Sequence, residues 1–524
     1  MPLRQPGSDP ARTSFRACER RLRLRGWGLA REVEAEGPHG EHPTGFAGLM
    51  RNRNYALLWS GQLVSEMGNR FHWIAVSLWI FSLTRSVAAV SLAISSMFVG
   101  GLLVGLWAGV FVDRLNRKAI LILSDLIRGI LVALIPILID MNLWFVYLDL
   151  ALVSVATAFF RPAIFAVMPQ VVQRRDLLPA NSFFTAMDTG TEVLGPVVAG
   201  FLAQSYGYAP LLYIDALTYI FSALCIFFMS VGSGLRERVN FHVRTVWNGV
   251  VDGLRYIRRD ELQRALFVLI FPATLVGAGL NALQTPLAKG EIGITDAEFG
   301  TFQSIWGMGF VVASLLLGWY GGQFRKSRII LGGYYLGFVA TALMGVSGGL
   351  NTLLLTAFVI GFSNTLYYVG LGTVLMEYTP ADLVGRVVST RQVALASARV
   401  ISPLVFGAIA GVTGIRPSII LMAALGAIGT TGAILMYPSV RQFDREWRAV
   451  RGRTSSFLKS ITEPLDADFE EGPQRLMNGV AILVVVIAWL GVAIRHYETA
   501  LILLLTALSL GLLGSWLRRR GLLP

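Results

Sequence analysis

Apolar residues run along this chain in long stretches, separated by short polar intervals rich in Arg and Lys. Runs of this length match the helix of about 20 residues that crosses a bilayer, whereas strands of a membrane barrel alternate over only about ten. The pattern therefore predicts an all-α integral membrane protein. Twelve spans form two groups of six, near 56–82, 88–112, 119–139, 143–170, 183–205 and 211–231, then 265–288, 299–322, 328–348, 352–376, 388–413 and 417–437. Two more, near 478–494 and 499–517, make a C-terminal hairpin and a total of fourteen transmembrane helices.

The polar intervals divide the chain into six predicted segments. They are a disordered basic cytoplasmic tail (1–49), a six-helix half (50–232), a cytoplasmic linker (233–264), a second six-helix half (265–440), a second cytoplasmic linker (441–477) and the hairpin (478–524). Met50 is an alternative natural start, because the apolar pattern begins just after it. In the first linker, Val246, Val250, Leu254 and Ile257 share one face, which predicts an amphipathic helix. It lies either on the inner membrane surface or in solvent.

Basic residues indicate the orientation of the spans. They concentrate in the loops after spans 2, 4, 8 and 10 and in the first linker, while the loops at 205–210 and 347–351 have none. The exceptions are Arg85, Lys289, Arg416 and Arg495. Loops rich in Arg and Lys stay in the cytoplasm. We therefore expect a multi-pass protein of the cell membrane with both termini inside.

The composition excludes several classes of function. Hydrophobic residues make up 54% of the chain and charged residues 15%, and the mean hydropathy is +0.60, which a water-soluble enzyme would not show. The net charge of +13 comes mainly from basic residues at span ends, so we expect no nucleic-acid partner. Two cysteines cannot build a disulfide framework. Because the sequence has no metal-ligand spacing, nucleotide-binding loop or nucleophile–base pair, we predict no enzyme and no cofactor.

The two groups of six spans resemble each other at an offset of 207 residues. At this offset five small or proline residues coincide: Ser182 with Ser389, Pro196 with Pro403, Gly200 with Gly407, Gly207 with Gly414 and Pro210 with Pro417. Two related halves joined by a long loop suit alternating access, in which the halves rock around a substrate at mid-membrane.

The segment GVFVDRLNRK (109–118), between spans 2 and 3, resembles the G-x-x-x-D-R-x-x-R-[RK] signature of the major facilitator superfamily. The resemblance implies the major facilitator fold. It also implies a cytoplasmic latch that holds the outward-open state, formed by Gly109, Asp113, Arg114, Arg117 and Lys118. Topology alone explains the basic residues, but not Gly109 and Asp113 at this spacing. The matching segment of the second half, 318–328, has no acid, so the latch is expected on one side only.

Six shorter segments resemble the branch of macrolide-efflux proteins and enterobactin exporters, at 52–68, 159–169, 177–183, 194–200, 214–224 and 382–389. This resemblance implies export of a small amphipathic organic molecule, such as a drug, macrolide or siderophore, in exchange for protons. Gly195, Pro196 and Gly200 resemble the helix-5 antiporter motif, although Gly and Pro are common in membrane helices. Two alternatives stay open: a lipid or lysolipid transporter, and a non-transporting scaffold or sensor whose hairpin binds a partner.

A charged residue inside a predicted span costs about 2.5–3.5 kcal/mol on insertion scales, and six such residues are candidates for a functional role. They are Glu66, Arg70, Arg161, Asp188, Glu192 and Arg399. We expect Glu66 to pair with Arg70, and Arg161 to contact Glu192 or Asp188. One interpretation is that a carboxylate, Glu192 first, carries the coupled proton. The other is that static ion pairs hold the spans together.

Further polar residues complete the predicted sites. The resemblance places spans 7 and 10 around the substrate cavity, and their polar residues are Asn281, Gln284, Asn364, Tyr367 and Tyr368. Asp215 is expected to cap the end of span 6, and His72 to be a packed polar residue.

Overall fold

The computed structural model describes residues 45–230, 243–321, 324–380 and 383–437. Side chains at 106, 109–110, 113–114 and 243–250 lie outside this description. The predicted C-terminal hairpin, the second linker and residues 1–44 of the predicted tail also lie outside it. All regular structure within the described ranges is helical, as the apolar run lengths predict.

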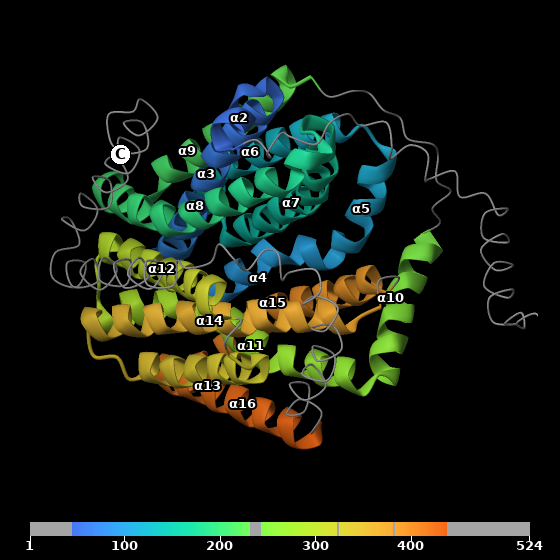
Figure 1. Cartoon of the computed structure of the whole chain (residues 1–524). Helices are drawn as coiled ribbons and strands as arrows, with labels where there is room; N and C mark the ends of the chain where they lie inside the picture. The colour runs from blue at the N-terminus through green and yellow to red at the C-terminus, as the bar shows by residue number, and fades with distance from the viewer. Residues whose placement is uncertain (1–44, 231–242, 322–323, 381–382, 438–524) are drawn as a thin grey trace, which may run out of the picture. The chain divides into compact units, whose positions relative to one another are not determined.

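The twelve spans predicted for the two halves are present in order. The first half contains α2 (Phe46–Arg51), α3 (Arg53–Thr84), α4 (Val87–Leu103), α5 (Gly105–Arg114), α6 (Arg117–Met141), α7 (Leu143–Val171), η1 (Arg174–Asp176), α8 (Leu177–Tyr206) and α9 (Tyr208–Phe228). After α10 (Val243–Arg259), the second contains α11 (Glu261–Thr285), η2 (Pro286–Ile292), α12 (Asp296–Tyr320), α13 (Lys326–Gly345), α14 (Leu350–Tyr378), α15 (Val384–Thr413) and α16 (Ile415–Met436). Figure 1 shows the blue-to-green helices of the first half grouped apart from the yellow-to-orange helices of the second.

Nine of the described helices are long and apolar enough to cross a membrane, namely α6, α7, α9, α11 with η2, and α12 to α16. The apolar helix α4 is shorter, at 17 residues. Helices α3 and α8 are 32 and 30 residues long and carry charged residues of the candidate site within their spans. The protein is therefore a multi-pass membrane protein.

The internal repeat extends to the ends of the helices. Helices α7 and α14 are both 29 residues long, α8 and α15 are both 30, and each pair is offset by 207 residues at both ends. The turn after α8 is made by Gly207 (φ 82°), and the turn after α15 by Gly414 (φ 92°). Positive φ values favour glycine, which explains why this residue occurs at the same place in both halves.

Two spans differ from the single straight helices expected. The second is interrupted at Val104, which separates α4 from α5. Here Gly100 and Gly101 weaken the helix, and the backbone N–H of Gly100 donates to Ser154 Oγ on α7 at 2.8 Å. The seventh span continues beyond α11 as the π-helix η2, which begins at Pro286, a residue without a backbone N–H.

Helix α10 confirms the predicted linker helix, but its described part packs on protein. Ile257 is 3% exposed and lies in a small apolar cluster with Leu375 and Val387. Asp252 pairs with Arg386 of α15 at 3.5 Å. At Ile257, neighbouring helices therefore cover the apolar face, while the side chains of Val246 and Val250 lie outside the described residues.

The two halves meet through two equivalent helix pairs, α8 with α12 and α15 with α4. At Gly200, a Cβ atom would lie 2.5 Å from the carbonyl oxygen of Asp296 and 2.8 Å from the Cα of Gly300. At Gly407, the repeat partner, a Cβ would lie 2.1 Å from Ser91 Oγ. The glycines that coincide in the repeat therefore allow the same close approach twice.

The contacts between halves concentrate at one end of the helices, the end where α8 and α15 finish. Tyr208 Oη of the first half donates to Asp296 Oδ2 of the second at 3.0 Å. Lys289 Nζ lies 2.6 Å from the other oxygen of Asp296. Gly190, in the middle of α8, and Gly318, near the other end of α12, have no described neighbour within 4 Å of a Cβ position. We call the first end the joined end.

Candidate functional site

An ion cluster joins α3 to α8, and we call it the accessible cluster. Arg70 Nη2 lies 3.3 Å from Asp188 Oδ1, and Arg70 Nη1 lies 3.8 Å from Glu192 Oε1. The side chains of Arg70, Asp188 and Glu192 are 26%, 49% and 40% exposed. The two carboxylates can therefore exchange protons with water. A Cβ at Gly195 would lie 2.6 Å from the side chain of Arg70, so this glycine lets α3 approach α8.

Arg70 is thus the residue that pairs with the acids of α8, a role predicted for Arg161. Among the described residues, no carboxylate oxygen lies within 4 Å of the Arg161 guanidinium. The carboxylate of Glu66 is also more than 4 Å from the guanidinium of Arg70. The expected pairs of Arg161 with the α8 acids and of Glu66 with Arg70 are therefore wrong. The physical reason is that Arg70 extends across to the next helix and does not pair along its own.

Arg161 and Arg399 come from different halves, and both are exposed. They lie within electrostatic range of each other, and Arg161 is also within range of Glu192. The guanidinium of Arg399 lies 5.7 Å from the ring centroid of Phe98 on α4. Phe98 in turn makes an edge contact with Trp73 of α3 at 6.0 Å. Arg399 of the second half thus lies close to α4 of the first half.

The accessible cluster lies where the close contact of α8 with α12 ends. The carbonyl oxygen of Glu192 is 2.9 Å from the Cβ position of Gly307, and Ser304 Oγ donates to the Val193 carbonyl at 2.5 Å. On the equivalent pair, Ser95 Oγ donates to the carbonyl of Val400, next to Arg399, at 2.9 Å. The repeat partners Glu192 and Arg399 therefore occupy equivalent places between the halves.

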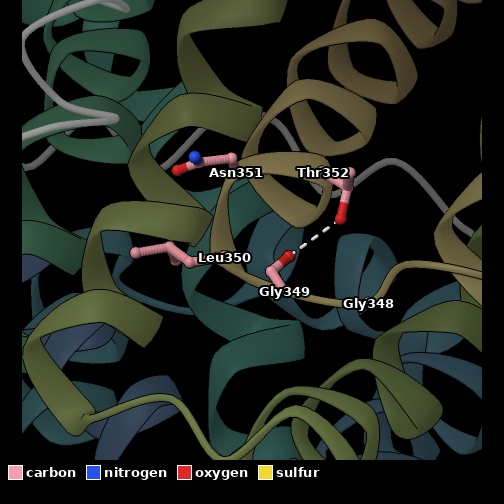
Figure 2. Close-up of a pocket in the computed structure, with 5 residues that line it drawn as sticks. All are labelled: Gly348, Gly349, Leu350, Asn351 and Thr352. Carbon is pink, nitrogen blue, oxygen red and sulfur yellow. Dashed lines mark hydrogen bonds between the residues drawn. The ribbon is translucent and has the colours of Figure 1, made fainter.

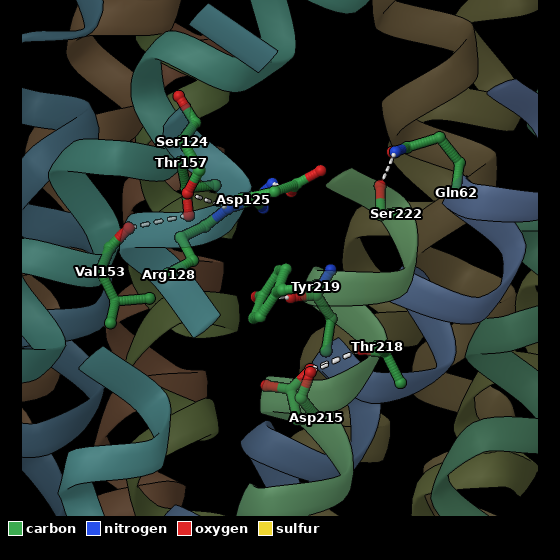
Figure 3. A network of polar contacts seen from close by, with 11 residues as sticks. Gln62, Ser124, Asp125, Arg128, Val153, Thr157, Asp215, Thr218, Tyr219 and Ser222 are labelled. Carbon is green, nitrogen blue, oxygen red and sulfur yellow. Dashed lines mark hydrogen bonds and ion pairs between the residues drawn. The ribbon is translucent and has the colours of Figure 1, made fainter. Parts of the chain in front are cut away.

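A second polar group lies inside the first half, and we call it the enclosed cluster; Figure 3 shows its part around Asp125, Arg128 and Asp215. Its ionisable members are His72 on α3, Asp125 and Arg128 on α6, Asp149 on α7 and Asp215 on α9. None is more than 7% exposed. Arg128 donates to Asp125 in a close ion pair and lies over the rings of Phe160 and Tyr219, at 4.0 and 4.5 Å.

Sequence reasoning missed most of this cluster. Asp125, Arg128 and Asp149 were readable as charged residues within apolar runs, but the runs stay hydrophobic overall around them. The interpretation of Asp215 as a helix cap is wrong, because it lies within α9, fully buried, with Oδ2 at 3.3 Å from His72 Nδ1. A Cβ at Gly68 would lie 2.3 Å from Asp215 Oδ1, so α3 and α9 are in close contact here.

The polar residues predicted for the substrate cavity are divided between core and accessible positions. Tyr367 stacks on the buried Tyr334 at 4.6 Å, and Gln284 is 2% exposed. Tyr368 is 51% exposed, with the guanidinium of Arg391 5.2 Å from its ring centroid. Asn281 and Asn364 are half-buried.

Figure 2 shows a shallow pocket at the start of α14, lined by residues 348–352. Thr352 Oγ1 donates to the Gly349 carbonyl at 2.9 Å within it. The lining has no charged side chain and includes none of the predicted cavity residues, so we do not assign substrate binding to it.

The described residues of the predicted latch bind within their own half. Arg117 Nη1 donates to the carbonyl of Ala166 at 3.0 Å. Lys118 Nζ donates to the carbonyls of Phe227 and Met229, at 2.7 and 2.8 Å, and so satisfies the end of α9. The side chains of Gly109, Asp113 and Arg114 lie outside the description.

Comparison with known proteins identifies the fold family. The family model described as Major Facilitator Superfamily matches residues 58–287 and again 266–518, one match for each half of the repeat. This chain belongs to the Major Facilitator Superfamily. The crystal structure of a mutant of the nucleoside transporter NupG has the same fold, with a TM-score of 0.62 at 13% identity over 73% of this chain and 99% of that one.

Efflux and multidrug resistance proteins are among the similar sequences. Macrolide efflux protein A of Streptococcus pyogenes is 24% identical over 341 residues, 63% of this chain and 83% of its own length. Multidrug resistance protein MdtG of Dickeya zeae is 24% identical over 371 residues, 69% and 85% of the two chains. The predicted resemblance to the efflux branch is confirmed, and the protein is a secondary transporter.

Proposed function

We propose that this transporter exports a small amphipathic organic molecule in exchange for protons. The observation that carries the proposal is the accessible cluster. Two carboxylates share one arginine, are partly exposed, and lie where the close contact between the halves ends. A change in that contact alters the surroundings of Glu192 directly, which is what coupling of a proton to alternating access requires.

The joined end is the outer end in this proposal. The basic loops predict that the opposite end faces the cytoplasm. Two of the basic residues at the joined end have acidic partners: Lys289 pairs with Asp296, and Arg416 pairs with Glu291 and donates to the carbonyl of Ser347 at 2.7 Å. Arg85 is exposed, with its guanidinium 5.8 Å from the ring centroid of Phe81. The conformation is then inward-facing, and Arg117 and Lys118 bind their own half because the latch is open.

Exchange follows from two opposing influences on the acids of α3 and α8. Burial favours the neutral carboxylic acid, and a nearby guanidinium favours the carboxylate. With the halves joined near Glu192, the guanidinium of Arg70 stabilises the Glu192 carboxylate, so that Glu192 releases its proton to the cytoplasmic side. Outward opening separates α8 from α12, changes the position of Glu192 and lets it take up a proton from outside.

Transport into everted membrane vesicles tests this mechanism. A macrolide, a catecholate siderophore and a fluorescent lysolipid are supplied with and without an imposed pH gradient. We expect gradient-dependent uptake of the macrolide or the siderophore, and its loss in Glu192→Gln at unchanged membrane levels. The matched control is Glu261→Gln, which changes an exposed acid at the start of α11. Full activity of the Glu192 variant would contradict the role of Glu192, and lysolipid movement without a gradient would favour a lipid transporter.

A further inference from the structure

The enclosed cluster has more acid than its bases can balance. Three carboxylates, Asp125, Asp149 and Asp215, share one guanidinium, Arg128, and one imidazole, His72. When all three acids are ionised, the positive charge of Arg128 balances one of them and two negative charges remain. A proton on His72 cancels one of them. The other needs a proton on a carboxylic acid, because an uncompensated charge in a buried site is very costly.

Among the described residues, no other charged group pairs with the cluster. The cluster lies along a row of helices in which α3 packs on α9, α9 on α6 and α6 on α7. Helix α4, which packs on α7, contains no ionisable residue. On α3, Arg70 is engaged by the acids of α8, and Glu66 is within electrostatic range of Tyr219 at the edge of the cluster. Tyr219 Oη itself donates to Asn69 Oδ1 at 2.5 Å.

The carboxylate oxygens also lack donors. Asp149 is 3% exposed, interacts electrostatically with His72, and has no hydrogen-bond partner for Oδ2 among the described residues. The Oδ2 atoms of Asp125 and Asp215 likewise have none, although Asp215 Oδ2 is 3.3 Å from His72 Nδ1. Buried polar atoms normally have hydrogen-bond partners, so the donors of the described residues do not fully neutralise these carboxylates.

The second half shows that the fold does not need these charges. At the offset of 207 residues, Gly279 corresponds to His72 and Met422 to Asp215. These two also meet, since a Cβ at Gly279 would lie 2.7 Å from Met422 Sδ, and Met422 is fully buried. Thr356, the counterpart of Asp149, donates to carbonyls of its own helix at 2.9 Å. The same helix contact is thus built once with ionisable groups and once without.

We propose that the enclosed cluster is a proton-binding site of the first half, separate from the accessible cluster. Asp149, His72 and Asp215 hold the exchangeable proton, and the ion pair of Arg128 with Asp125 supplies the fixed charge beside it. The ligand is a proton and not a metal ion, because the described residues contain no group of three or more His, Cys, Asp or Glu side chains arranged to hold a metal. Use of this proton in transport rests on the proposed antiport, but its binding does not.

Infrared difference spectroscopy of the full-length protein in liposomes, titrated with acid and base, tests the site without any substrate. We expect the carbonyl stretch of a protonated carboxylic acid to titrate in the wild type. It should disappear or shift in Asp149→Asn and shift in His72→Gln. The control Asp252→Asn, on the exposed surface of α10, should leave the signal unchanged. Glu192→Gln distinguishes the accessible cluster, because it should remove a different component of the signal.

The outcomes separate this inference from the proposed function. An identical titration in wild type, Asp149→Asn and His72→Gln would overturn the site, whether or not efflux depends on Glu192. Should Asp149→Asn fail to reach the membrane, Asp215→Asn provides the same reading. Efflux without a pH gradient would overturn antiport but not a carboxyl signal that depends on Asp149.

Discussion

The two halves of this transporter have closely similar helices but different interiors. The first contains the enclosed cluster and both acids that bind Arg70. The second has apolar or uncharged residues at the equivalent places: Met422 for Asp215, Thr356 for Asp149 and Leu395 for Asp188. Met422 and Leu395 are 0% and 6% exposed. The comparison teaches that buried charge is an addition to the helix bundle and not a condition for it, so its presence in one half points to function.

The largest effect is expected when the charge of the first half is copied into the second. Met422→Asp would place a carboxylate at a fully buried position opposite Gly279, with no base beside it. We expect a loss of about 3 kcal/mol of stability, the cost of a charged residue at mid-membrane. Thermal unfolding in detergent measures it, with Met422→Leu as the control of similar volume. Equal stability of the two variants would show that the second half also accommodates charge.

The next largest effect concerns the contact between the halves. Gly200→Ala would push a methyl group against the backbone of α12, so we expect a loss of about 1–3 kcal/mol. Gly190→Ala, ten residues earlier on the same helix, meets no neighbour and should gain about 0.5–1 kcal/mol. Gly407→Ala should be milder than Gly200→Ala, because it meets the side chain of Ser91 and not backbone. The unfolding midpoints of the three variants give the ranking. A higher midpoint for Gly200→Ala than for Gly190→Ala would contradict the close contact of α8 with α12 at Gly200.

A smaller effect is expected at the joined end. Tyr208→Phe removes the hydrogen bond to Asp296 that links the halves and should cost about 1 kcal/mol. The control is Tyr206→Phe, since Tyr206 is 69% exposed. Comparison of their unfolding midpoints checks the prediction, which would be wrong if both variants matched the wild type.

The smallest effect on stability should come from the reverse exchange. The double variant His72→Gly with Asp215→Met gives the first half the apolar contact of the second. Replacing a buried charged pair by packed apolar groups is often neutral or better, so we expect a net change of less than about 1 kcal/mol. The same variant should lose the titrating carboxyl signal. A strongly destabilised double variant would instead assign the pair a structural role.

The arrangement of spans was predictable because the length of an apolar run determines whether it crosses a bilayer. The partner of Arg70 was not, because pairing depends on which faces of α3 and α8 meet, and hydrophobicity is similar around both helices. The interruption at Val104 depends on a contact with Ser154 of α7, and the burial of Asp215 depends on the close approach at Gly68. Such details arise from packing between distant segments, which a linear pattern does not contain.

The constant offset between α7–α9 and α14–α16 has a consequence for how the two halves diverged. One residue inserted within a helix turns every later side chain by about 100°, since a turn contains 3.6 residues. Such a change would move the glycines at 200 and 407 away from the opposite half. The two halves therefore differ by exchanges such as aspartate for methionine, while α7 and α8 have the same lengths as α14 and α15.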